Sequence, residues 1–230
     1  MKYFYYKTAI SVCLSSCLLL LAGCVNFTSN ESELSQSIAW YTGAAGHVDD
    51  VLAQSLLLSA AATEDVLATM WIARVHSTGR MGFAQDKRLA QETAAAVIDE
   101  IERLANADVA EAAFLMGTAF AEGLGKSINP VSAAIWYERG AKLGNMLAQH
   151  NMGNIYASGT GVPPSDALAV AWWRQASEQG DAIPQFRLAL MLEQGRGVNL
   201  DLEEAIRWYR DSANRGYAQA QDALDRLSAN

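Results

Sequence analysis

Three stretches of the chain superimpose when the sequence is shifted by 36 residues. The stretch "AEGLGKSINPVSAAIWY" (121–137) aligns with "ASGTGVPPSDALAVAWW" (157–173) and with "EQGRGVNLDLEEAIRWY" (193–209). Self-similarity at a period of this length is the signature of stacked repeats, in which each unit buries its apolar face against its neighbours. The chain is therefore expected to fold as a repeat array. The positions that coincide are Gly123, Gly159 and Gly195; Gly125, Gly161 and Gly197; and Trp136, Trp172 and Trp208.

Each unit has the pattern of two helices. A small residue, such as Gly153, lies on the apolar face of the first helix and allows a close approach of the partner helix. The Gly-x-Gly that follows permits a reversal of the backbone at positive φ. Four residues later a residue suited to capping begins the second helix. The three tryptophans are predicted to be buried wedges between hairpins, and a ladder that stacks on a ligand is the alternative. The three caps are Asn129, Ser165 and Asp201.

The letters "GLGKS" also resemble the end of a phosphate-binding loop. That loop needs a glycine five positions before Gly125 and a preceding strand. Position 120 is Phe, and "EAAFLMGTAF" before it has a helical pattern. The two sister turns lack Lys and Ser, so the turn of a helical hairpin is the favoured interpretation.

The segment "AQHNMGNIYASGTGVPPSDALAVAWWRQASEQG" resembles a Sel1-like repeat, a relative of the tetratricopeptide repeat. The resemblance extends over residues 109–227 and implies an all-α, right-handed solenoid of helical hairpins. Lys126, Ala189 and Leu192 depart from the family pattern, which is structural rather than catalytic. The predicted division is a signal peptide (1–23), a polar tether (24–40), a degenerate N-terminal repeat or cap (41–108), three repeats (109–144, 145–180, 181–216) and a C-terminal capping helix (217–230).

The N-terminal region of the body, residues 41–108, follows the repeat pattern less well. A helix is expected over about 49–60, and a second is expected after an N-cap at Thr63, with Met70 and Trp71 on its apolar face. A longer helix follows the predicted cap Asp86. Its apolar stripe is expected at Leu89, Thr93, Val97, Ile101 and Leu104.

The N-terminus has the pattern of an export signal. Two lysines, the apolar run "ISVCLSSCLLLLA" and then "LAGC" resemble the lipobox of bacterial lipoproteins. The resemblance implies lipidation of Cys24 and cleavage before it, and Val25 after it implies transport to an outer membrane, with the body in the periplasm. An uncleaved signal anchor and a plain cleaved signal are the alternatives. Cleavage would remove Cys13 and Cys17, so the mature chain could form no internal disulfide.

The chain is acidic, with 17 basic and 25 acidic residues. Removal of Lys2 and Lys7 with the signal leaves 15 against 25, or minus 10. Such a body repels nucleic acid and anionic headgroups, so a nucleic-acid partner is not expected and membrane contact is expected through lipid on Cys24.

Nothing in the sequence predicts an enzyme. The three histidines, His47, His76 and His150, show no metal spacing, and G-x-S-x-G, H-E-x-x-H and S-x-x-K are absent. No catalytic residue, metal or cofactor is therefore assigned. Some disulfide-rich relatives are associated with β-lactam binding or hydrolysis, but this chain lacks their cysteines.

The expected function is a non-enzymatic adaptor that binds a protein or peptide on its concave face. Stacked hairpins create such a face from their first helices. Asn151 and Asn154 are the preferred residues, since amides can pair with an extended backbone. A scaffold for envelope polysaccharide or peptidoglycan is the alternative, and it requires exposed aromatic rings on that face. The groove candidates are Leu115, Thr118, Glu122, Asn151, Asn154, Ser158, Arg187, Leu190 and Gln194.

Overall fold

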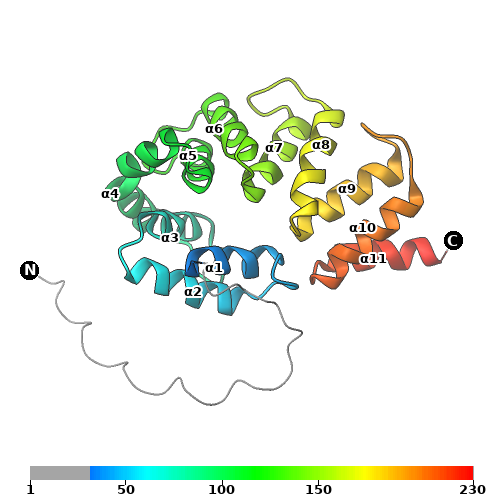
Figure 1. The fold of residues 1–230 in the computed structure, drawn as a ribbon, viewed down its shortest axis with the longest axis horizontal. Coiled ribbons are helices and arrows are strands. Elements are labelled where there is room, and N and C mark those ends of the chain that lie inside the picture. Colours follow the sequence, from blue (N-terminus) through cyan, green and yellow to red (C-terminus); the bar gives the residue numbers. More distant parts are fainter. Residues whose placement is uncertain (1–31, 230) are drawn as a thin grey trace, which may run out of the picture.

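The computed structural model describes residues 32–229, which form eleven α-helices and no strand. Helices α1 to α10 follow one another as five hairpins, and α11 ends the array (Figure 1). The all-α hairpin solenoid predicted from the 36-residue period is thereby confirmed. The helices are α1 (Glu33–Thr42), α2 (Asp50–Ala62), α3 (Val66–Thr78), α4 (Lys87–Asn106), α5 (Ala110–Glu122), α6 (Pro130–Lys142), α7 (Met146–Ser158), α8 (Asp166–Glu178), α9 (Ala182–Gln194), α10 (Leu202–Asn214) and α11 (Ala218–Ser228).

The solenoid curves until its two ends meet. In Figure 1 helices α1, α3 and α5 lie on the inside of the arc and their partners α2, α4 and α6 on the outside. The connection between α1 and α2 lies against the turn between α10 and α11. There the guanidinium of Arg215 donates to the carbonyl of Gly43 at 2.7 Å, and the backbone N–H of Val48 donates to the carbonyl of Arg215 at 3.2 Å. These bonds close the solenoid into a ring.

The Gly-x-Gly turns act as predicted, and the two glycines have different roles. Gly159 ends α7 in the left-handed conformation at φ 73°, and the equivalent residues end α5 and α9. Gly161, at φ 79°, also lies against the preceding repeat, because a Cβ there would approach the carbonyl oxygen of Pro130 to 2.5 Å. The second glycine therefore permits close contact between successive repeats. Asn129, Ser165 and Asp201 cap the second helices through side-chain acceptors.

The buried wedge of each repeat is the residue after the predicted tryptophan. Trp136, Trp172 and Trp208 are only partly buried, so the wedge prediction is wrong for them. The first helix lies so close that a Cβ on Gly153 would come within 2.3 Å of the indole of Trp173. In each of the three repeats the second helix carries two adjacent aromatic residues, and the close approach of the first helix encloses the second of the two. The residues enclosed there are Tyr137, Trp173 and Tyr209.

Part of the segment predicted to be a polar tether is helical. Residues 33–40 belong to α1, which begins after Ser32, whose hydroxyl accepts from the N–H of Ser35. Leu34 is buried in the core, and the hydroxyl of Ser37 donates to the carbonyl of Ala53 in α2 at 2.6 Å. Packing against α2 thus stabilises a helix in a segment whose composition is typical of a linker.

Two details of the N-terminal hairpins also differ from the predictions. Asp65 rather than Thr63 caps α3, because its carboxylate accepts from two backbone N–H groups of the first turn. In α4 the buried residues lie one position after the predicted ones, except at Ile101, which is buried as predicted. Leu89, predicted to be buried, is exposed. Small alanines occupy that stripe and leave room for the large side chains of α3. The buried residues of α4 are Ala90, Ala94, Ile98, Ile101 and Ala105.

The signal, the lipobox and Cys24 lie outside the described residues. Within residues 32–229 no helix is both long and apolar enough to cross a membrane. The capping helix predicted at the C-terminus is present as α11, in which Asp225 is exposed.

Candidate binding site in the central cavity

The inner face of the ring encloses a cavity of about 570 Å³. Helices α1, α3, α7 and α9 contribute to its walls, together with the turn between α10 and α11. A second cavity, of about 320 Å³, lies between α3, α6 and α7. Four residues line both cavities, so the two form adjoining parts of one concave site. These residues are Arg74, Arg80, Asn151 and Asn154.

The two preferred asparagines lie where the sequence predicted them, on the concave side of α7. Asn154 is exposed, and its side-chain oxygen accepts from the indole N–H of Trp173 at 3.3 Å. The buried wedge therefore orients this amide, and its NH₂ group remains available to donate to a ligand. Ser158 lines the smaller cavity, where its hydroxyl lies 2.7 Å from that of Thr160.

Five of the other candidates, Leu115, Thr118, Arg187, Leu190 and Gln194, line neither cavity. Thr118 is buried, and its hydroxyl accepts from the phenol of Tyr137 at 3.2 Å, so its role lies in the core. The exposed Arg187 and Gln194 of α9 line neither cavity. Helix α9 contributes to the larger cavity through its first turn instead, at Ala182 and Ile183. Of the apolar candidates, Leu115 is fully buried in the core.

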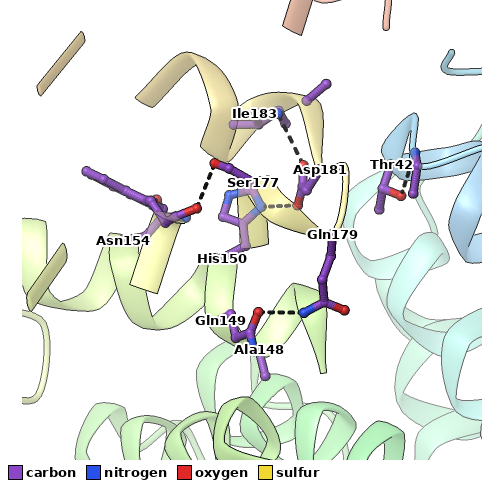
Figure 2. A network of polar contacts seen from close by, with 12 residues as sticks. Thr42, Ala148, Gln149, His150, Asn154, Ser177, Gln179, Asp181 and Ile183 are labelled. Carbon is purple, nitrogen blue, oxygen red and sulfur yellow. Dashed lines mark hydrogen bonds and ion pairs between the residues drawn. The ribbon is translucent and has the colours of Figure 1, made fainter. Parts of the chain in front are cut away.

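A polar network supports the wall between α7 and α9 (Figure 2). The ring of His150 lies with Nδ1 2.8 Å from Asp181 Oδ2, while Asp181 Oδ1 accepts from the N–H of Ile183 at 3.1 Å. Beside this pair, Gln179 donates to the side-chain oxygen of Gln149 at 2.7 Å. His150 lines the larger cavity, and its contact with the N-cap of α9 holds the two helices in register.

Helix α3 supplies the part of the site that the sequence analysis missed. Arg74 and the nearby Arg80 line both cavities, but both lie in the segment interpreted as a degenerate repeat. The sequence did contain an indication of this site, because Arg74 follows Trp71 by three positions and therefore lies on the same apolar helix face. A charged residue on a face destined for burial is rare unless it has a partner or a function.

The phenol of Tyr137 faces the same region. Burial raises the pKa of Tyr137 to about 12, so the hydroxyl remains protonated and continues to donate to Thr118. Arg74 and Arg80 line the same cavity as Tyr137, and their charges act against burial and lower the pKa of this phenol. The smaller cavity is therefore rich in donors: two guanidinium groups and two amides.

Residues 32–229 contain no group of three His, Cys, Asp or Glu side chains placed to bind a metal ion. The carboxylate of Glu111, in the first turn of α5, accepts from the indole of Trp71 at 2.6 Å and from the amide of Asn145 at 2.7 Å. Burial raises the pKa of Glu111, although these two hydrogen bonds oppose the shift. Glu111 lines neither cavity and joins α3, α5 and α7.

Comparison with known proteins identifies the repeats. A family model described as Sel1 repeat matches residues 110–145, 147–181 and 185–217. The resemblance to this family inferred from the sequence is thus confirmed for these residues. A search of curated proteins found no match.

Two solved structures are similar in fold. One is c5321 of uropathogenic Escherichia coli, described as a protective antigen with an SLR fold, at 24% identity and a TM-score of 0.55. It covers 85% of this chain, which spans 48% of that protein's length. The other is a Sel1 repeat protein from Oxalobacter formigenes, at 28% identity and a TM-score of 0.53, over 56% of this chain and 96% of that one.

Proposed function

We propose that this Sel1 repeat protein is a non-enzymatic adaptor of the bacterial envelope that binds a protein or peptide partner in the central cavity of its ring. The observation that carries the proposal is the pair of amides, Asn151 and Asn154, on the concave face of α7. Asn154 is oriented by a buried indole, and an amide held in this way can pair with the backbone of an extended peptide. Stacked repeats commonly use their concave surface in this manner.

We propose that the protein acts by binding alone. The histidine and the aspartate at the wall of the larger cavity are engaged in structural contacts: His150 pairs with Asp181, which also caps α9. A hydrolase would need a nucleophile beside a free base, and this pair leaves neither. The β-lactam activity associated with some relatives is therefore not part of the proposal.

An envelope polysaccharide or peptidoglycan is the less favoured ligand. Sugar binding would need aromatic faces that are open to the cavity. The aromatic side chains at the edge of the larger cavity, Tyr41 and Tyr217, are engaged in ring contacts instead: Tyr41 with Trp71 at 6.3 Å between centroids, and Tyr217 with Phe186 at 5.2 Å.

We further propose that lipid on Cys24 anchors the protein to the outer membrane, with the ring facing the periplasm. Support comes from the "LAGC" sequence and the apolar run before it. Helix α1 begins at Glu33, so only a short segment would separate the anchored Cys24 from the folded body. The ring would then work close to the membrane surface. Replacement of Cys24 by Ser should release the protein from the membrane fraction.

The proposed function is tested by photo-crosslinking in living cells with the probe at position 154. One dominant protein adduct is expected, and it should disappear when the probe is moved to position 175, on the outer helix α8. The Asn154→Ala variant should recover less of the same partner. Adducts of glycan alone, or equal adducts at 154 and 175, would refute a partner in the cavity.

A further inference from the structure

The cavity contains a buried cation whose hydrogen bonds are incomplete. The side chain of Arg74 is only 6% exposed, yet its Nε and Nη1 have no hydrogen-bond partner among residues 32–229. The guanidinium is held over the ring of Trp71 at 4.6 Å and over that of Phe114 at 5.2 Å from the centroids. These contacts fix its position and partly stabilise the charge, but they satisfy few of its five donors.

The nearest carboxylate does not complete the hydrogen bonding of Arg74. Glu122 Oε1 lies 4.0 Å from Nε, which is beyond hydrogen-bond distance. The other oxygen of Glu122 accepts a hydrogen bond from the hydroxyl of Ser77. A buried guanidinium with unsatisfied N–H groups is unfavourable, and an anion that accepts from these groups would remove that cost.

We propose that Arg74 binds a carboxylate of the peptide partner, either a C-terminal carboxylate or an Asp or Glu side chain. Arg74 lines both cavities together with Asn151 and Asn154, and its side chain is 6% exposed, so it borders the space that these amides line. Arg80 lines the same two cavities and is exposed, with one guanidinium nitrogen 3.3 Å from the hydroxyl of Tyr41. The second cation would therefore strengthen the attraction for an anion. This inference rests on the proposed function and names the chemistry of the partner.

The charges around the site favour a carboxylate over a phosphate. The planar fork of a guanidinium matches a carboxylate with two parallel hydrogen bonds. Glu122 already places one negative charge 4.0 Å from Arg74, and Asp181 adds another at the wall of the larger cavity. A doubly charged phosphate would meet stronger repulsion from both than a singly charged carboxylate.

The test is affinity selection of synthetic octapeptides on the full-length chain held in detergent. Three randomised pools are compared by mass spectrometry of the retained peptides. The first has free C-terminal carboxylates and no Asp or Glu, the second is amidated and contains Asp or Glu, and the third is amidated and contains neither. At least one acidic pool should be enriched about tenfold or more over the neutral pool, as expected for charge-assisted hydrogen bonds. The enriched pool identifies the source of the carboxylate.

The variants separate a binding role of Arg74 from a structural one. Arg74→Gln should abolish the preference for acidic peptides, and Arg74→Lys should restore part of it, because the charge returns without the fork. Arg80→Gln alters an exposed side chain and should reduce the preference several-fold even if Arg74→Gln does not fold. Arg187→Gln is the matched control, since this exposed arginine lies outside both cavities, and it should leave the preference unchanged.

Two results would overturn the carboxylate assignment. One is equal retention of the neutral and acidic pools, or retention of none. The other is an unchanged preference in both Arg74→Gln and Arg80→Gln when each melts cooperatively. In either case, crosslinking at position 154 still decides separately whether a protein partner occupies the cavity, so failure of this inference is distinguishable from failure of the proposed function.

Discussion

Replacement of Gly153 by alanine tests the close packing on which each hairpin depends. In an exposed helix the change would stabilise the fold by about 1 kcal/mol, because alanine has the higher helix propensity. Here the new Cβ would lie 2.3 Å from the indole of Trp173, far inside the ~3.5–4.0 Å of an ordinary carbon contact. The indole or the helix must move, and such overpacking typically costs about 1–3 kcal/mol. Displacement would also weaken the bond from Trp173 to Asn154. With about 0.5–1.5 kcal/mol for the weakened bond added and about 1 kcal/mol of helix propensity subtracted, we expect a net loss of about 0.5–3.5 kcal/mol.

Urea unfolding followed by far-ultraviolet circular dichroism measures this loss. The matched experiment introduces Gly153→Ala into a Trp173→Ala background, where the clash is absent. There the same change should stabilise the fold by up to about 1 kcal/mol. At the equivalent site of the next repeat, Ala189→Gly should destabilise by about 1 kcal/mol, since alanine is already accommodated there. A single Gly153→Ala variant as stable as the wild type would refute the close-packing argument.

Three further predictions concern the core, the ring and a buried acid. Trp173→Ala should cost about 3–5 kcal/mol, whereas Trp172→Ala, at a partly buried site, should cost clearly less; equal thermal midpoints would contradict this assignment of the wedge. Arg215→Ala removes the 2.7 Å bond that joins the two ends of the solenoid, so small-angle X-ray scattering should give a larger radius of gyration, while the exposed Arg210→Ala should not change it. Burial raises the pKa of Glu111 above its ordinary 4.5, so the folded state binds its proton more tightly than the unfolded state does. The free energy of unfolding of the wild type, compared with that of Glu111→Gln, should therefore fall as pH rises through the raised pKa. If the difference between the two free energies does not vary with pH, burial does not shift the pKa of Glu111.

The turns and caps of the repeats could be predicted from the sequence because they depend on local chemistry. Glycine at positive φ and a side-chain acceptor at the N-cap act within a few residues, so Gly159 and Ser165 have the predicted roles. The repeat period itself indicates which units stack. Of the candidate site, the positions of Asn151, Asn154 and Ser158 on one face of α7 follow from the helical period, and all three line a cavity; their binding role stays a prediction.

The remaining features depend on how the helices approach one another. Periodicity places both residues of an aromatic pair near the interface, but only the distance between helices decides that Trp173 is enclosed and Trp172 is not. Likewise α1 is a helix because Leu34 finds a buried place against α2, which no local pattern in a polar segment could indicate.

The sequence by itself determined the helical hairpins, their order and the turns between them, because these follow from interactions between residues close in the chain. Only the tertiary structure decided that the solenoid closes on itself, since a small rotation at each repeat accumulates over the whole array before Arg215 can reach Gly43. Ring closure also decided where the cavity lies. The curvature of the array placed the incompletely hydrogen-bonded Arg74 of the degenerate repeat in one cavity with the asparagines of α7, and it left Arg187 outside.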